Sequence, residues 1–199
     1  MHKFDRGQPP VDFSKYVGEN WDSFSATEDH RTLSDALYAR QDGYCAYCES
    51  FLQSKECGHI EHLERRSEHP EKTFDWHNLF FSCLRRTSCG KYKDEHKPKI
   101  TFHRADIVDP SRENPADFFF FDMTGTIHPK EGSGKHRAKE TIRVLNLNDP
   151  GLVQQRKCAG ATLSSYFGAT DAVKDEFLAF LAANRVPFLF FYSSMLNRI

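Results

Sequence analysis

The chain has 199 residues and a net charge of −1 at neutral pH, and 39% of its residues are hydrophobic. This length predicts one domain, or a small domain with an appendage, and the near-neutral charge argues against a general electrostatic binder of nucleic acid. No run approaches the roughly 18 apolar residues of a membrane span, and the first ten residues lack the apolar core of a signal peptide. We therefore expect a cytoplasmic protein with no membrane partner, whose six cysteines bind metal in preference to forming disulfides.

The N-terminal part of the chain predicts an arm followed by a helix. Residues 1–25 are expected to form an arm whose aromatic side chains pack on the body or on a partner, although the first ten residues are equally compatible with a disordered tail. Ser25 or Thr27 has the side chain of a helix N-cap, and acidic residues follow in the first turn. The helix is expected to end at Gly43.

A central region, residues 26–109, combines short elements with most of the cysteines. Basic residues exceed acidic ones by three between positions 61 and 105, which is compatible with phosphate binding without establishing it. The pattern predicts a turn at 45–48, a strand at 57–63, a polar loop at 67–74, an apolar segment at 76–81, a short helix at 89–96 and a possible strand at 100–102.

The C-terminal region, residues 110–199, is expected to be mostly helical. The predicted elements are a hairpin of 117–122 with 124–128 around Gly125, helices at 137–147 and 152–166, a helix that begins near Asp171, and a strand-like apolar run at 187–192. Such an apolar run must be covered by the fold or by another subunit, because an open apolar edge aggregates.

Four cysteines have a spacing that suits a structural zinc site. Cys45 and Cys48 are separated by two residues, and Cys83 and Cys89 by five. Four thiolates complete a tetrahedral zinc site, whose binding energy contributes directly to folding. The second gap is wider than usual, so another ligand could replace one of this pair, and Cys57 is close enough to compete. The alternative is that some of these are buried apolar cysteines, as we expect for Cys158.

The dipeptide Glu61-His62 stands between the two cysteine pairs and has the chemistry of a phosphodiesterase. Hydrolysis of a phosphodiester needs an activated water, which a neutral imidazole supplies, and charge relief, which a divalent ion held by a carboxylate supplies. Adjacent residues of a strand point to opposite faces, so the pair can act together only where a strand meets a loop. Alone, the dipeptide occurs by chance in many proteins.

Several separated motifs, in order, carry a resemblance to a known family. They are IEHLERRSEHPEKTFDWHNLFFSC, SCGKYKD and RAKETIRVLNLNDPGLVQQRK, which together span roughly residues 40 to 160. This stretch resembles the HNH endonucleases of Septu-type and retron-associated anti-phage systems, the PtuB-like family. The resemblance implies an α+β fold: a ββα-metal finger with structural zinc, placed between an N-terminal helix and the mostly helical C-terminal region.

The resemblance assigns roles to individual residues. His62 matches the general base, Glu61 the acidic ligand of the catalytic ion, and Asn78 the middle letter of the motif, whose side-chain amide can hold the loop that carries the base. Many HNH enzymes have a histidine directly after the final cysteine, whereas this chain has Gly90, which offers no side-chain ligand. Asp94 could present a carboxylate towards the same place.

Other candidates around this site remain open. His96 and His59 are alternatives to Asp94 as the remaining ligand. Lys93 is expected to neutralise substrate phosphate, and Arg65 and Arg66 are further candidates for substrate binding, although an arginine pair by itself usually forms a solvated face.

The resemblance also implies cofactors and partners. The expected cofactors are Mg²⁺ or Mn²⁺ at the catalytic site and structural Zn²⁺. The expected partners are a nucleic acid substrate, DNA or RNA, a PtuA-type ATPase and, in a retron, a reverse transcriptase with its RNA–DNA product. The alternative is a zinc-stabilised subunit that binds nucleic acid or protein without catalysis, with the Phe-rich segments 117–121 and 187–192 as its interaction surface.

Overall fold

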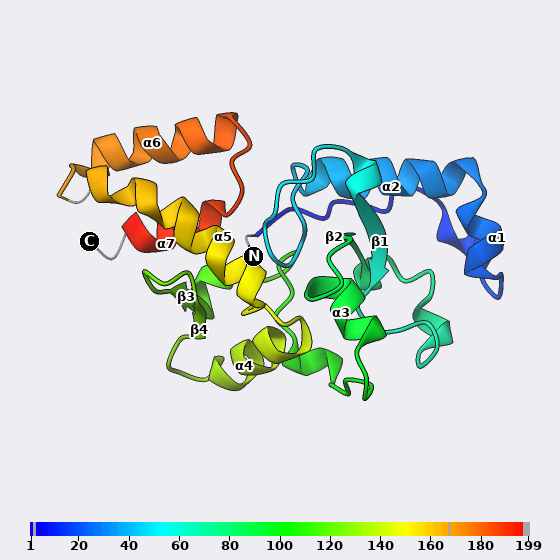
Figure 1. The fold of residues 1–199 in the computed structure, drawn as a ribbon. Coiled ribbons are helices and arrows are strands. Elements are labelled where there is room, and N and C mark those ends of the chain that lie inside the picture. Colours follow the sequence, from blue (N-terminus) through cyan, green and yellow to red (C-terminus); the bar gives the residue numbers. More distant parts are fainter. Residues whose placement is uncertain (2, 167, 197–199) are drawn as a thin grey trace.

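The computed structural model describes residues 1, 3–166 and 168–196. The N-terminal elements lie on one side of the molecule and the C-terminal helices on the other, as the blue-to-red colouring of Figure 1 shows. One continuous set of buried apolar side chains links the two sides, because it contains residues from the N-terminal segment through Leu196.

The N-terminal segment packs on the body of the protein. Helices α1 (Trp21–Ser25) and α2 (Glu28–Arg40) follow one another, and Thr27 caps α2 by accepting a hydrogen bond from the backbone N–H of His30. Of the two expected N-caps, Thr27 is thus the one used. Phe4, Trp21 and Phe24 are buried, so the aromatic side chains of this segment contribute to the core.

A ββα unit follows. Strand β1 (Gly58–His62) pairs antiparallel with β2 (Leu79–Cys83), so that His62 lies opposite Leu79, and α3 (Cys89–Glu95) packs against β2. The predicted strand at 57–63 and the predicted helix at 89–96 are both confirmed. The Gln41 amide, at the end of α2, bonds the N–H and the carbonyl of Phe81, which joins α2 to β2.

Among its described residues, the C-terminal region holds a second small sheet and four α-helices. The elements are β3 (Phe119–Phe121), β4 (Ile127–Pro129), α4 (Lys135–Val144), α5 (Pro150–Gly160), α6 (Asp171–Ala183) and α7 (Leu189–Leu196). Strands β3 and β4 pair antiparallel, which confirms the predicted hairpin. This part is mostly helical, as expected.

Three predictions about secondary structure are wrong. The run 187–192 is not a strand: most of it belongs to α7, a helix that is buried on several faces because it is apolar all round. Segment 100–102 forms no strand, and Arg65 Nη1 donates a hydrogen bond of 2.8 Å to the carbonyl of Ile100. The expected helix 152–166 is divided into α5 and a 3-10 segment, Ala161–Tyr166.

The Phe-rich segments do not form the exposed surface that a protein-interaction subunit would need. Phe121 of β3 packs edge-on against Phe190 and Phe191 of α7, with ring centroids 5.3 and 5.4 Å apart. The two predicted interaction segments therefore cover each other within the fold. In the described part of the chain, no helix is long and apolar enough to cross a membrane.

Candidate functional site

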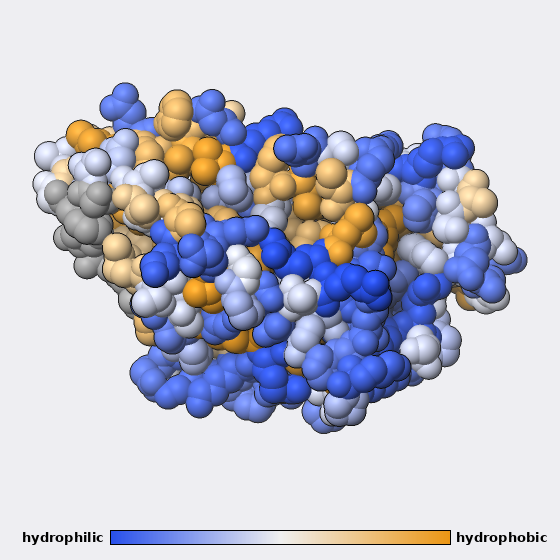
Figure 2. Space-filling view, viewed as in Figure 1, coloured by the Kyte–Doolittle hydropathy of each residue, from blue (hydrophilic) through white to orange (hydrophobic). Residues whose placement is uncertain are grey.

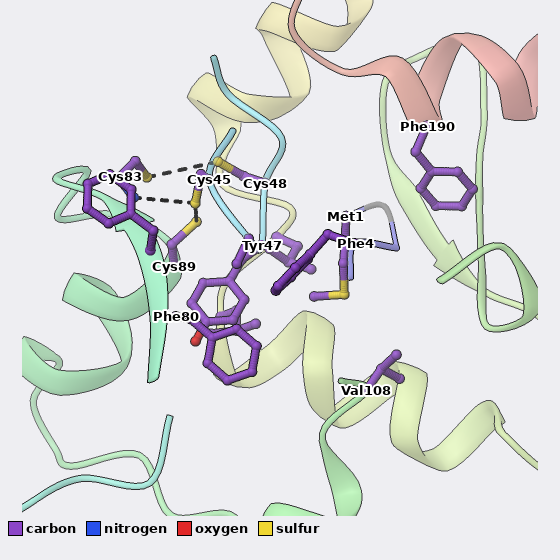
Figure 3. Packing of buried hydrophobic residues seen from close by; sticks show 14 of the residues in the cluster. Met1, Phe4, Cys45, Tyr47, Cys48, Phe80, Cys83, Cys89, Val108 and Phe190 are labelled. Atoms are coloured by element: carbon purple, nitrogen blue, oxygen red, sulfur yellow. Dashed lines mark hydrogen bonds between the residues drawn. The ribbon is translucent and has the colours of Figure 1, made fainter. Parts of the chain in front are cut away.

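The four predicted cysteines converge at one buried place. The sulfurs of Cys45, Cys48, Cys83 and Cys89 all lie within 4.8 Å of one another, and Figure 3 shows them pointing towards a common centre. The separations are 3.8 Å for Cys45–Cys89 and 3.9 Å for Cys48–Cys83. Sulfurs around a tetrahedral zinc ion with Zn–S bonds of about 2.3 Å lie about 3.8 Å apart. The group could therefore hold a metal ion such as zinc.

Backbone and proton chemistry support this interpretation of the cysteine cluster. Cys89 begins α3 with a φ of 60°, a conformation that a non-glycine residue adopts only where its surroundings impose it. Burial raises the pKa of the Cys89 thiol, whereas hydrogen bonds within the cluster, first from Cys45, lower the pKa of Cys48. Such opposite shifts are typical of thiols that share protons, and one divalent ion stabilises all four thiolates together.

The other two cysteines lie outside the cluster. Cys57 is exposed, and its sulfur lies 3.8 Å from the Ser54 hydroxyl. Cys158 is also exposed, on α5, so the expectation that it packs in the interior is wrong. Cys57 is therefore not one of the cysteines that could bind the metal ion at the cluster.

The end of β1 carries the Glu61-His62 pair. Both side chains are nearly completely buried, and both line a cleft of about 700 Å³ between the N-terminal segment, β1 and α3. His62 is the last residue of the strand, which is where a side chain can leave the strict alternation of faces. Adjacent residues of a strand normally point to opposite faces, but at this strand end Glu61 and His62 line the same cleft.

The His62 imidazole is neutral and held on two sides. Its Nε2 lies 2.9 Å from the carbonyl oxygen of Thr73, and since a carbonyl only accepts, Nε2 carries the proton and Nδ1 remains able to accept one. The Trp21 ring packs edge-on against the imidazole at 4.3 Å. Burial lowers the pKa of His62 to about 3, so the ring is neutral at pH 7, with its one proton on Nε2. Sequence reasoning missed both contacts, because one is a backbone carbonyl and the other comes from the N-terminal segment.

Asn78 clamps the loop that follows β1. Its side-chain oxygen accepts a hydrogen bond of 2.7 Å from the N–H of Glu64, and its amide nitrogen donates to the carbonyls of Glu64 and Lys72, at 3.0 and 3.1 Å. The backbone N–H of Leu63 also donates to the Asn78 carbonyl. This one buried side chain thus fixes the loop directly after His62.

Lys93 lies in a different place from the one that phosphate binding requires. Its side chain is 0% exposed, and its ammonium lies 2.9 Å from Glu61 Oε1 and 2.6 Å from Asp94 Oδ1. The Glu61 contact is an ion pair whose angles fall outside those of a hydrogen bond. Burial raises the pKa of Glu61 to about 7, against the opposing effect of Lys93. Both proposed metal-ligand carboxylates therefore face the lysine.

Gly90 leaves the room that Glu61 occupies. A Cβ atom built at this position would lie 2.3 Å from Glu61 Oε2, so any larger residue would displace the carboxylate. The glycine that interrupts the HNH pattern thus has a steric role. Sequence reasoning noticed the departure but not this consequence, which depends on α3 packing directly over β1.

The two arginines after the Glu-His pair behave differently. Arg65 is buried: its guanidinium contacts Asp94, Glu68, the Ile100 carbonyl and the Lys93 carbonyl, so it supports the fold around α3. Arg66 is 42% exposed beside the Trp21 ring, at 5.5 Å. Both arginines line the cleft, and Arg66 is the more exposed of the two.

The cleft has a basic rim. Besides Arg66, it is lined by Lys91, Lys97 and Lys99, and the surface over α3 is hydrophilic in Figure 2. Of the alternative ligands, both line the cleft: His96 is bonded to the Pro98 carbonyl, while His59 Nε2 is buried with no hydrogen-bond partner among the described residues. In that part of the chain, no third His, Cys, Asp or Glu joins Glu61 and Asp94 at metal-binding distance.

Comparison with known proteins adds one relative. No protein-family model matches the chain. The chain is 30% identical over 136 residues to a protein of Vibrio cholerae serotype O1 biovar El Tor named "Retron Vc95 putative HNH endonuclease". The match covers 64% of this chain and 62% of that protein, so the chain spans less than two thirds of its relative.

Proposed function

We propose that this protein is an HNH endonuclease that hydrolyses phosphodiester bonds of DNA or RNA. The observation that carries the proposal is the convergence of Trp21 of α1, the end of β1 and the helix α3 around one cleft with a basic rim. In that cleft a neutral imidazole and a carboxylate are adjacent. The retron name of the relative agrees with a nucleic acid substrate.

His62 is proposed as the general base. Its Nε2–H donates to Thr73, so Nδ1 is the nitrogen that can accept a proton from an attacking water. With a pKa of about 3 the ring is in its basic form throughout the neutral range. Asn78 positions this base through the backbone of the following loop and does not need to touch the substrate.

The bound phosphate is proposed to contact the rim of the cleft. Arg66 is the candidate among the residues assigned from sequence, because it is exposed and lines the cleft beside the base. Arginine suits this role since its planar guanidinium can donate two hydrogen bonds to a phosphate. Lys93 is completely buried and does not line the cleft, and the Arg65 guanidinium is already engaged by Asp94 and Glu68, so neither is the first candidate for phosphate binding in this conformation.

Two metals belong to the proposal. Zn²⁺ would be held by the four thiolates, where the sulfur separations fit it. Mg²⁺ or Mn²⁺ would draw on the oxygens of Glu61 and Asp94, and when bound it supplies charge relief at the phosphate. The donor types suit such an ion, but the place between the carboxylates holds the Lys93 ammonium, so the residues do not fit a bound ion in this conformation.

The wider setting is a further part of the proposal. The resemblance to PtuB-like proteins and the retron name of the relative support an effector subunit in anti-phage defence, in the cytoplasm, with a PtuA-type ATPase and a retron reverse transcriptase as partners. The net charge of −1 agrees with targeting by such partners. Binding and cutting of nucleic acid at physiological salt by the isolated protein, as efficiently as by a complex, would count against this part.

The test of the function is a cleavage assay on plasmid DNA and tRNA with Mg²⁺ or Mn²⁺. We expect His62→Ala to reduce cleavage by about 100-fold or more, the range for loss of a general base. His69→Ala is the matched control, because His69 is an exposed histidine on the loop that follows β1. Zinc content should be unchanged in both. Cleavage by His62→Ala at the parental rate would show that the assignment is wrong, and no cleavage by the parent would favour a binding module.

A further inference from the structure

The carboxylate pair in the cleft already has a cation of its own. Lys93 Nζ lies between Glu61 and Asp94 and donates a third contact, of 3.0 Å, to the backbone carbonyl of His62. Three oxygens thus surround one ammonium, which donates hydrogen bonds to Asp94 and to the His62 carbonyl and forms an ion pair with Glu61. The lysine side chain is completely buried, so this is a built site and not a passing surface contact.

Cations already surround the carboxylate pair. Lys93 Nζ lies 2.9 Å from Glu61 and 2.6 Å from Asp94, and Arg65 contacts both Asp94 and Glu68 at 3.1 Å. A divalent ion placed on the same oxygens while the ammonium remained would lie at contact distance from it, beside the buried Glu61 side chain. Because like charges at contact distance repel strongly, and most strongly where one of them is buried, the ammonium and the ion cannot share these oxygens.

We propose that the Lys93 ammonium is the resident cation of the Glu61–Asp94 pair, and that a divalent ion reaches these oxygens only by displacing it. This inference rests on the proposed function for the identity of the incoming ion. The cleft of about 700 Å³ beside α3 offers space into which a lysine side chain can move. Because Lys93 also holds the His62 carbonyl, its displacement changes the support of the proposed base.

The proposal is tested on the zinc-loaded wild-type protein by lysine acetylation, mapped by mass spectrometry, with and without Mn²⁺. Mn²⁺ binding is measured in parallel by electron paramagnetic resonance. We expect Lys93 to be protected without Mn²⁺ and to become reactive over the Mn²⁺ range that is bound, while the exposed Lys139 of α4 reacts equally in both conditions. If no Mn²⁺ binds, continued protection of Lys93 agrees with a resident ammonium.

Two results would overturn the proposal. The first is that Mn²⁺ binds at Glu61 and Asp94, as shown by loss of binding in Glu61→Gln, while Lys93 stays protected from acetylation. The second is that Lys93 reacts in the absence of Mn²⁺. Neither readout depends on cleavage, so failure of the nuclease assignment is seen separately in the assay with His62→Ala.

A second measurement uses substitution of the lysine. Lys93→Met should bind Mn²⁺ at least about tenfold more tightly than wild type, because the competing charge is gone. Lys91→Met is the matched control: it removes the same charge from the same helix, but Lys91 pairs with Glu95 and not with the carboxylate pair. A similar gain in both variants, or none in Lys93→Met when it folds, would show that Lys93 does not compete with the ion. The acetylation experiment decides the matter if Lys93→Met does not fold.

Discussion

Two places in this molecule gather side chains that bind cations, and the fold completes them differently. At the cysteine cluster, four buried thiols face one another at separations that suit one metal ion. At the cleft, the buried Glu61 and the partly exposed Asp94 face a buried ammonium. Thiolates of this kind need a metal to hold their charge together, whereas the carboxylates have an internal counterion.

This difference predicts how much the cysteine cluster and the carboxylate pair each contribute to the stability of the fold. The cluster joins the 45–48 turn, β2 and α3, so a metal there would add a link between three segments that also contact one another directly. The carboxylate pair joins neighbouring elements, β1 and α3, through contacts that exist without metal. We therefore expect metal removal to unfold the protein through the first place and to leave the second intact.

The largest effect should come from the thiol cluster. Cys45→Ser removes one of four ligands, and structural zinc sites contribute on the order of 10 kcal/mol to folding in small domains. We expect loss of zinc, measured by elemental analysis, and loss of cooperative thermal unfolding. Cys57→Ser is the control, since Cys57 is exposed and outside the cluster. A Cys45→Ser protein that is as stable as the control would show that metal binding at the cysteine cluster does not stabilise the fold.

A smaller effect is expected at the carboxylate pair. Glu61→Gln leaves the buried Lys93 with Asp94 as its one carboxylate, and breaking a buried ion pair costs about 3–5 kcal/mol. Glu95→Gln is the control. It removes an ion-pair partner of the exposed Arg86 from α3, the helix that also carries Lys93, and should lower the free energy of unfolding by less than about 1 kcal/mol. Urea unfolding measures both. Equal costs would show that Lys93 is not held as the structure has it.

Local elements were largely predictable because their signals are local. The N-cap at Thr27, the short strand β1 and the short helix α3 each depend on a few adjacent residues. The cysteine quartet was found from spacing alone, since thiols that bind one ion usually come in such pairs. The apolar run that became α7 was not, because a short apolar run has the same pattern in a buried strand and a buried helix.

The electrostatic organisation of the site was not predictable from sequence. Lys93 stands among charged residues, in GKYKDEHK, where the ordinary expectation is a solvated helix face. Its burial depends on Gly90, which lets the Glu61 carboxylate approach α3, and that proximity arises only when the ββα unit is packed. The same holds for Arg65, whose partners come from three separate segments.

The third prediction concerns pH and the base beside the carboxylate pair. His62 has a pKa of about 3 in the folded protein against 6.5 when unfolded. The unfolded chain therefore binds the extra proton, so the stability that neutral His62 contributes is present above pH 6.5 and is lost as pH falls towards 3. Relative to His62→Gln, which keeps a donor for Thr73, wild type should lose about 1.4 kcal/mol per pH unit below 6.5.

This measurement separates the two places. Acid also releases metal from thiolates, but that effect is common to wild type and His62→Gln and cancels in their difference. Urea unfolding at pH 7 and pH 5 is sufficient. A difference that does not change with pH would mean that the imidazole is more open to water than its contacts with Trp21 and Thr73 imply.

The smallest effect should come from the exposed cation at the rim. Arg66→Ala should weaken nucleic acid binding only several-fold and reduce its salt dependence, because one phosphate contact is lost while the buried charges remain. The control is Lys135→Ala on α4, which pairs with Glu131 and does not line the cleft. Binding measured by fluorescence anisotropy across a salt series distinguishes them. An equal, small change in both variants would show that the substrate does not bind at this cleft. It would also contradict the distinction between buried cations that stabilise the site and an exposed cation that contacts the phosphate.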